Sequence, residues 1–286
     1  MSGNNKKIIA FNYFGGKFSW TEWLYAYFPK KFTHLAEIFG GSMVVTLNYN
    51  GKCIRTVNEL NGDITNFFQV LREDTAELVT ALELTPCSEQ SYIDSWPIEG
   101  TRLERARKFY VRVRQSYYGL GAQRENKSWH MAKTKLHAKV GETVSKWNNA
   151  LPKLLDVARL IRTNFQIINV DAIIAIERLD AKSTFFYLDP PYILETRGSH
   201  DYYKFEFSHD QYKELASVLY KIKGYAMISG YDHPLMNELF ESKGWTKIEF
   251  PIKRNNIRSK QVRECIWINY SIDFTNNGKQ EAFELN

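Results

Sequence analysis

One segment, Thr184-Phe-Phe-Tyr-Leu-Asp-Pro-Pro-Tyr192, indicates both the fold class and the place of a binding site. Its first five residues carry no charge and form a continuous run, which is typical of a strand buried on both faces in a parallel sheet. Ligands of open α/β sheets bind beyond the carboxyl ends of the strands. We therefore expect Asp189, which directly follows this strand, to lie at a binding site.

The residues Asp189 to Tyr192 have the properties of a rigid binding ledge. Two prolines fix the backbone φ angle and remove two N–H donors. Asp189 offers a carboxylate, Pro190 a free carbonyl and Tyr192 an aromatic ring, a set that suits a planar base with an exocyclic amine. The alternative is a simple turn after a strand, because Asp-Pro and Pro-Pro are ordinary loop sequences.

The rest of the chain alternates between short apolar strands and amphipathic helices, which predicts an α/β fold with a parallel sheet. A short strand or extended segment is expected at residues 8–13, and strands at 34–39, 53–57, 166–170, 184–188, 225–229, 246–252 and 264–270. Helices are expected at residues 20–28, 43–50, 62–72, 102–118, 144–162, 172–179, 211–221 and 234–243. Because only a basic loop separates the last two strands, we expect them to form an antiparallel pair at the sheet edge.

A basic segment interrupts this alternation. Residues 102–139 contain eleven Lys and Arg against two Glu, a surplus of nine, whereas the whole chain has a surplus of only six. Aromatic side chains are interleaved with these charges. The combination predicts a polyanion partner. The alternative is a solvated helix face followed by a charged loop.

The composition disfavours several classes of protein. Cys53, Cys87 and Cys265 form no Cys-x-x-Cys pair, which excludes a zinc knuckle and suits a reducing cytoplasm. No apolar signal sequence follows the first residues, and no apolar run reaches the roughly 18 residues that cross a bilayer. The histidines do not stand at ligand spacing with a carboxylate partner, so we expect no metal site.

Two more strand ends carry residues that suit a nucleotide-like ligand. Glu37-Ile-Phe-Gly-Gly-Ser42 ends one strand and opens a helix, and its glycines allow a ligand to approach the backbone closely. Glu59 ends the next strand, 19 residues after Gly40, where nucleotide-binding folds place an acid on the ribose hydroxyls. Asp171 ends the strand before the tetrapeptide and could accept from an adenine amine. Each feature alone is a weak signal, because a glycine turn is usually only a turn and an acid at a strand end is more often a helix cap.

Taken in order, these motifs resemble those of the Dam-type (D12-class, alpha-group) adenine-N6 DNA methyltransferases. The resemblance spans residues 8–270 and consists of Phe14-Gly-Gly-Lys17, Glu37-Ile-Phe-Gly-Gly-Ser42, the basic segment with Ser116-Tyr-Tyr-Gly-Leu120, Asp189-Pro-Pro-Tyr192 and the late strand Cys265-Ile-Trp-Ile-Asn-Tyr270. Three residues depart from the family pattern. Ile38 stands where proline is usual, Met43 where a small residue is common and Glu59 where aspartate is usual.

The resemblance implies a fold and a reaction. The fold is a Rossmann-like methyltransferase sheet, mostly parallel with an antiparallel edge strand, plus an inserted, mainly helical target-recognition domain. We expect the discontinuous catalytic domain at residues 1–80 and 166–275, the insert at 81–165 and a frayed tail at 276–286. The implied reaction transfers a methyl group in line from S-adenosylmethionine to adenine N6, after the base has been flipped out of double-stranded DNA.

The resemblance also implies roles for individual residues. The catalytic residues would be Asp189, Pro190, Pro191 and Tyr192. The cofactor would be bound by Tyr13, Phe14, Gly15, Gly16, Lys17, Glu37, Phe39, Gly40, Gly41, Ser42, Glu59, Asp171 and Asp189. The charged and aromatic residues expected to contact DNA are Arg105, Lys108, Arg112, Tyr118, Arg124, Lys127, Trp129, Lys133, Lys135, Arg254 and Arg258.

Two other functions remain open from the sequence. The chain could be an RNA adenine methyltransferase, or a nucleic-acid-binding protein that keeps the fold without the activity. We expect a cytoplasmic protein of a bacterial or phage-infected cell with no membrane partner. It has either a cognate restriction endonuclease or none, as an orphan or phage enzyme would, and it is a monomer or a dimer.

Overall fold

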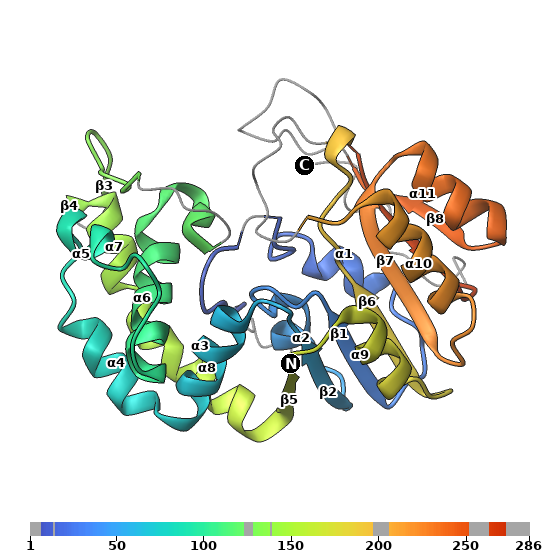
Figure 1. The fold of residues 1–286 in the computed structure, drawn as a ribbon, viewed down its shortest axis with the longest axis horizontal. Coiled ribbons are helices and arrows are strands. Elements are labelled where there is room, and N and C mark those ends of the chain that lie inside the picture. The colour runs from blue at the N-terminus through green and yellow to red at the C-terminus, as the bar shows by residue number, and fades with distance from the viewer. Residues whose placement is uncertain are drawn as a thin grey trace, which may run out of the picture.

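The computed structural model describes residues 7–13, 15–122, 128–137, 139–196, 206–251 and 263–272, without the side chains of residues 118 and 122. Figure 1 shows two parts side by side, a lobe that consists mainly of helices and a lobe built on a sheet. The expected tail at residues 276–286 lies outside the described residues. No described helix combines the length and the apolar character that crossing a membrane requires.

The larger sheet has seven strands in the order β5-β2-β1-β6-β7-β9-β8. Its strands are β1 (His34–Ile38), β2 (Ile54–Asn58), β5 (Phe165–Ile168), β6 (Thr184–Leu188), β7 (Tyr225–Tyr231), β8 (Thr246–Glu249) and β9 (Glu264–Ile268). The first five in spatial order run parallel, and β9 is antiparallel to both neighbours. The predicted antiparallel pair at the edge is confirmed. The edge strand itself is β8, so the antiparallel strand lies one position inside the edge.

The register of the central strands fixes the position of the site. All five residues of β6 are buried, as their apolar sequence predicted. Ile38 at the end of β1 is aligned with Asn58 at the end of β2 and with Leu188 at the end of β6. The residues that follow these strands therefore emerge next to one another at one edge of the sheet.

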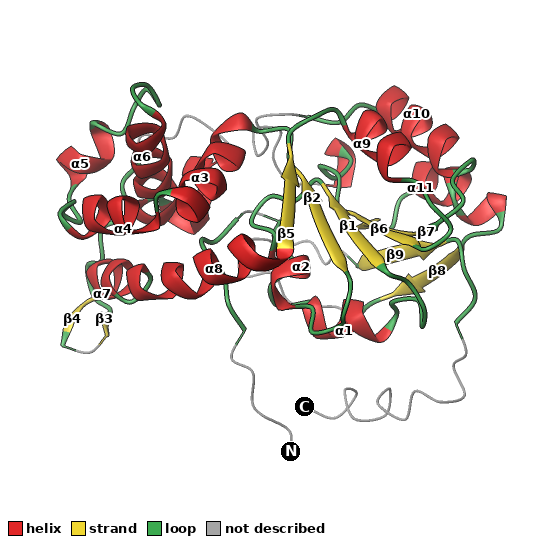
Figure 2. Cartoon of the chain, turned by 90° about the horizontal axis from the view of Figure 1, so that it is seen from below, coloured by secondary structure: helices red, strands yellow, loops and turns green. Residues whose placement is uncertain are grey.

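Helices cover both faces of this sheet. Figure 2 shows α9 (Ala172–Leu179), α10 (His209–Leu219) and α11 (Pro234–Leu239) on one face, and α1 (Thr21–Ala26) and α2 (Val44–Asn48) on the other. Each face has its own cluster of buried apolar side chains. This explains why the central strands are apolar on both sides.

The helical lobe contains α3 (Gly62–Glu73), α4 (Thr75–Glu83), α5 (Glu89–Ile93), α6 (Arg102–Gln115), α7 (Glu142–Asn148) and α8 (Leu151–Asn164), with the short hairpin β3 (Leu136–His137) and β4 (Val140–Gly141). Its core joins α3 to α6, for example through the stacked rings of Phe67 and Tyr110, whose centroids are 5.4 Å apart. A reciprocal capping box of Thr101 and Glu104 starts α6 where the sequence predicted.

Three further features of this lobe can be compared with the sequence-based expectations. The expected boundary after residue 80 falls inside α4, and α3 packs with the helices that follow it. Residues 8–13 form no strand, and Phe11 instead packs in the core of the helical lobe. Helix α5 was not expected in the polar stretch after Pro86. It begins because Ser88 accepts a hydrogen bond from the amide of Ser91.

Candidate active site

The loop between β1 and α2 follows a left-handed path. Phe39, Gly41 and Met43 have positive φ angles of 64°, 50° and 57°, which non-glycine residues adopt rarely. Gly40 must lack a side chain, because a Cβ there would lie 2.3 Å from Cγ1 of Val57. The sequence predicted that the glycines admit a ligand. In the structure Gly40 also admits the neighbouring strand β2.

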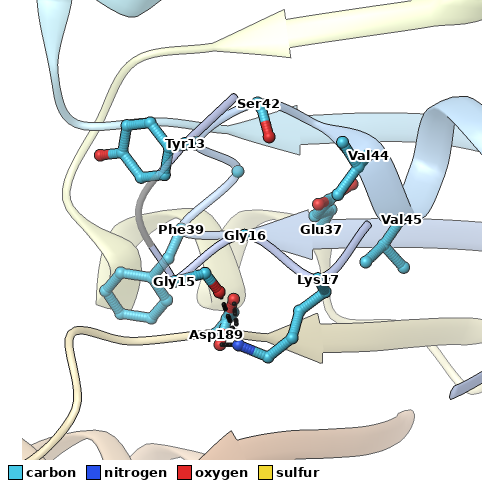
Figure 3. A pocket seen from close by; sticks show the side chains of 12 residues that line it. Tyr13, Gly15, Gly16, Lys17, Glu37, Phe39, Ser42, Val44, Val45 and Asp189 are labelled. Carbon is cyan, nitrogen blue, oxygen red and sulfur yellow. Dashed lines mark hydrogen bonds and ion pairs between the residues drawn. The ribbon is translucent and has the colours of Figure 1, made fainter. Parts of the chain in front are cut away.

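Two adjacent cavities lie at this edge of the sheet. The smaller one is lined by Tyr13, Gly15, Gly16, Lys17, Glu37, Phe39, Gly40, Gly41, Ser42, Val44, Val45 and Asp189. Figure 3 shows its side chains. The larger one has a volume of about 370 Å³ and is lined by Tyr13, Phe39, Asn58, Glu59, Leu60, Asn61, Asp171, Ala172, Asp189, Pro191, Glu206, Phe207 and Gln211. Both cavities share Tyr13, Phe39 and Asp189.

The structure brings together the residues that the resemblance assigned to the cofactor. Each of them that the structure describes lines one of the two cavities, and Phe14 lies outside the described residues. Their role in binding stays a prediction. Sequence reasoning missed Glu206 and Phe207, which precede α10, and Gln211 in its first turn, all of which line the larger cavity. No motif marks them, because they come from a different part of the fold.

Three carboxylates of the cavities are tied to the backbone around them. Oε2 of Glu37 accepts from the amide of Thr46 at 2.8 Å, and burial raises the pKa of Glu37 to about 7. Glu59 accepts from the amides of Gly41 and Asn61, both at 2.7 Å, and burial raises its pKa as well. Asp171 caps α9, so the helix-cap explanation holds for it. It also lines the larger cavity.

Asp189 has a buried cation as its partner. Nζ of Lys17 lies 2.8 Å from Oδ1 and 3.0 Å from Oδ2 of Asp189, and it also donates to the carbonyl of Gly15 at 3.0 Å. Figure 3 shows Lys17 reaching Asp189 beneath the loop of Gly15 and Gly16. The hydroxyl of Ser229 on β7 donates to Oδ1 of Asp189 at 2.7 Å. The carboxylate is thus fixed from two sides.

A second carboxylate shares this cation. Oε1 of Glu264 at the start of β9 lies 3.4 Å from Nζ of Lys17. Burial alone would lower the pKa of Lys17, but the charges of Asp189 and Glu264 raise it well above its ordinary value. Lys17 is therefore an ammonium ion in the protein.

Tyr192 lies beside this group of charges and is 6% exposed. Its hydroxyl donates to Oε1 of Glu264, and its ring meets the ring of Tyr231 edge-on. Nζ of Lys17 lies 4.7 Å from the centroid of the Tyr192 ring. Lys17 therefore lies over this ring, and the expected role of Tyr192 in holding a base stays a prediction.

The residues expected to contact DNA have different environments. Arg105 pairs with Asp63 at 3.1 Å, and Lys108 donates to the carbonyl of Pro97. Arg112, which was expected to contact DNA with them, lies in a different environment. It is 8% exposed, and its guanidinium carbon lies 3.1 Å from the centroid of the Trp96 ring.

The other expected contacts lie near the hairpin or outside the described residues. Trp129 forms a bridge with Ser116 and donates to Gln115, whereas Lys133 and Lys135 are exposed. Outside the described residues, or without a described side chain, are Tyr118, Arg124, Lys127, Arg254 and Arg258. Within the described part of the chain, no cluster of three or more His, Cys, Asp or Glu could hold a metal ion.

Fold and site together show an α/β protein with two adjacent cavities at the carboxyl ends of its central strands. Residues 13–254 match the family model of the D12 class N6 adenine-specific DNA methyltransferases. The chain belongs to this family, and it is an adenine-specific DNA methyltransferase, as its motifs predicted. A comparison with curated proteins gives no match.

The departures from the family pattern have clear places in the structure. Met43 is fully buried in the core shared with the helical lobe, and it does not line either of the two cavities described above. Ile38 is a buried residue of β1. Glu59 accepts a hydrogen bond from the amide of Gly41 in the loop between β1 and α2. None of these three residues crowds the described site.

Proposed function

We propose that the chain binds S-adenosylmethionine in the two cavities and methylates N6 of an adenine that has been flipped out of double-stranded DNA. The observation that carries this proposal is the position of Asp189. It lines both cavities and directly follows β6, beside the end of β1, which leads into the loop of Phe39 to Ser42 that lines the smaller cavity. A carboxylate at this junction can hold an acceptor amine close to a bound cofactor.

The residues of the cavities suit the groups of this cofactor. Glu37 offers a buried carboxylate to an ammonium group, and Glu59 and Asn61 offer oxygen atoms to ribose hydroxyls. Asp171 can accept from an adenine amine at the edge of the larger cavity. When bound, S-adenosylmethionine supplies a methyl group made electrophilic by the sulfonium.

The tetrapeptide after β6 would hold the acceptor. An adenine amine is a weak nucleophile, because its lone pair is delocalised into the ring. Asp189 and the carbonyl of Pro190 would accept its two hydrogen atoms and stabilise the positive charge that develops on nitrogen as the new bond forms. The amine loses one proton in the reaction, and Asp189 need not be the group that finally takes it.

Entry of the base requires a local change at Lys17. The ammonium contacts both oxygens of Asp189 and lies over the ring of Tyr192. A base that stacks on Tyr192 and donates to Asp189 has to displace it. Stacking on an aromatic ring contributes on the order of 1–3 kcal/mol, which helps to offset this displacement and the unstacking of the base.

The segment at residues 81–165 would serve as the inserted recognition domain. Its support is the surplus of nine positive charges in residues 102–139 and the exposure of Lys133 and Lys135 next to the β3–β4 hairpin. Lysines on a protruding hairpin suit contacts to phosphates, which position a protein on DNA. Arg112 is excluded from this set by its burial.

The substrate is tested with labelled cofactor and three acceptors. Purified protein is incubated with methyl-tritiated S-adenosylmethionine and with unmethylated duplex DNA, the same DNA as single strands, or RNA. We expect label in N6-methyldeoxyadenosine, transferred fastest to the duplex. Label mainly in RNA would favour the RNA enzyme. Bound cofactor without transfer to any acceptor would favour an inactive binding protein.

A further inference from the structure

Glu264 is a buried carboxylate that the matched family motifs do not include. It is the first residue of β9, where it is paired in register with Tyr231 of β7, and it is 8% exposed. The family match ends at residue 254, ten residues before it. A carboxylate at such a depth needs donors around it, because burial of a charge is costly without them.

The donors around Glu264 belong to the active site. A single oxygen, Oε1, accepts from the hydroxyl of Tyr192 and lies 3.4 Å from Nζ of Lys17. Tyr192 and Lys17 come from distant parts of the chain, and each also lies next to Asp189 or to its partner cation. Glu264 is therefore joined to Asp189 through Lys17.

The cluster of Lys17, Asp189 and Glu264 has one cationic and two acidic side chains. Lys17 carries one positive charge, and the carboxylates of Asp189 and Glu264 share it. Among the described residues these two are the anions in contact with Lys17. Without the charge of Glu264, the ammonium would have Asp189 as its one remaining anion, and attraction in this buried setting would bind it more tightly there.

A substrate amine competes with Lys17 for Asp189. The carboxylate of Asp189 offers two lone pairs on each oxygen. Ser229 uses one on Oδ1, and Lys17 contacts both oxygens. An amine can be held well only if the ammonium weakens its contact with Asp189. Glu264 is the anion within reach that can take it up.

We propose that Glu264 is a positioning residue for methyl transfer, which draws the Lys17 ammonium from Asp189 when the substrate amine enters and holds the Tyr192 ring beside it. This inference rests on the proposed role of Asp189 as the acceptor of the amine. Glu264 itself touches neither substrate nor cofactor. Its effect should appear in the rate of transfer, with little change in binding.

The test is the substitution Glu264→Gln, which keeps the size of the side chain and an oxygen for the Tyr192 hydroxyl but removes the charge. We expect kcat on duplex DNA to fall at least tenfold, and the KM for DNA and the Kd for S-adenosylmethionine to stay within about threefold. The matched control is Glu249→Gln on β8, whose carboxylate pairs with Lys247 and Arg263 at the surface. Its kcat should equal that of the native protein.

A double variant separates action through Lys17 from a general effect on packing. Lys17→Met removes the ammonium, so adding Glu264→Gln to it should lower kcat less than twofold further. If the two losses multiply instead, Glu264 does not act through Lys17, and the proposal is wrong. Should Lys17→Met fail to fold, the single Glu264→Gln variant decides, because an unchanged kcat would also overturn the proposal.

The same assay distinguishes this inference from the proposed function. A native protein that methylates DNA while Glu264→Gln matches it would leave the function standing and refute the positioning role. A native protein without activity on DNA would refute both.

Discussion

Glu37 is the cavity residue whose ionisation is most clearly set by its surroundings. Its carboxylate is buried next to Asp189 and is held by the amide of Thr46. Burial raises its pKa from 4.5 to about 7, against the smaller lowering by its hydrogen bonds. The cofactor-free protein therefore tends to hold a proton at this position, and a cationic ligand would favour its release.

This shift makes a prediction about stability and pH. Because folding raises the pKa of Glu37, this residue contributes to the free energy of unfolding. The contribution is fully present below the unfolded pKa of 4.5 and is lost as pH rises through about 7. The shift corresponds to about 3 kcal/mol. Between pH 5 and pH 8 we expect the free energy of unfolding of the cofactor-free native protein to decline. In Glu37→Gln the decline should be smaller by this amount. Urea denaturation at several pH values measures the difference, and parallel curves for the two proteins would contradict it.

Single residues also show what sequence reasoning can reach. The end of β6 identified Asp189, because a buried parallel strand is recognisable from its composition and its carboxyl end is a known place for ligands. The partner of Asp189 was harder to predict. Lys17, Asp189 and Glu264 are brought together by the order of strands and by a loop, and no local pattern encodes that meeting.

At the scale of elements, the glycine loop between β1 and α2 decides the shape of the smaller cavity. Gly40 lies against β2, whereas Gly62 at the start of α3 has nothing within 4 Å of its Cβ position. These two positions make a matched pair, since Gly40 lines the smaller cavity and Gly62 follows Asn61, which lines the larger one.

We expect Gly40→Ala to lower the free energy of unfolding by about 1–3 kcal/mol, because an added methyl group would overlap Val57. The loop must shift, so the affinity for S-adenosylmethionine should fall as well. Gly62→Ala should be neutral or stabilising by up to about 1 kcal/mol. Chemical denaturation and calorimetry measure both effects. Equal stability of the two variants would show that the loop has room that the structure does not indicate.

The elements themselves were mostly predictable. Strand β6 and helix α9 have the predicted bounds. The sequence of each element shows where it begins and where it ends. Helix α5 was missed because it depends on one serine cap in a polar stretch. The position of Arg112 was missed because helical periodicity describes one helix alone. It does not reveal that Trp96, from the segment before α6, covers that face.

At the scale of the whole molecule, the basic residues have two kinds of surroundings. Lys133 and Lys135 are exposed near the hairpin, whereas Arg112 is part of the packing of the helical lobe. The basic residues counted in the sequence are thus divided between exposed positions and the packed interior of the helical lobe. The helix α3, before the expected domain boundary, packs with the helices that follow that boundary.

We expect Lys133→Ala and Lys135→Ala each to weaken DNA binding and to reduce the slope of log affinity against log salt by about one. Lys182→Ala, an exposed lysine before β6, should leave the slope unchanged.

Arg112→Ala should instead destabilise the fold, by about 2 kcal/mol for the lost contact with Trp96, at an unchanged slope. Fluorescence anisotropy at several salt concentrations and thermal melts measure these effects. A lower slope of log affinity against log salt in Arg112→Ala would show that Arg112 contacts DNA.

The central claim is that the carboxylate of Asp189 holds the adenine amine during methyl transfer. It is tested most directly by measuring N6-methyldeoxyadenosine in duplex DNA after incubation with the native protein and with Asp189→Asn at saturating S-adenosylmethionine. The control is Asp180→Asn. Asp180 lies before β6, and its carboxylate accepts from the amides of Lys223 and Gly224 before β7. We predict that Asp189→Asn binds the cofactor but forms at least 100-fold less product, while Asp180→Asn keeps its activity. Native levels of product from Asp189→Asn would contradict the account.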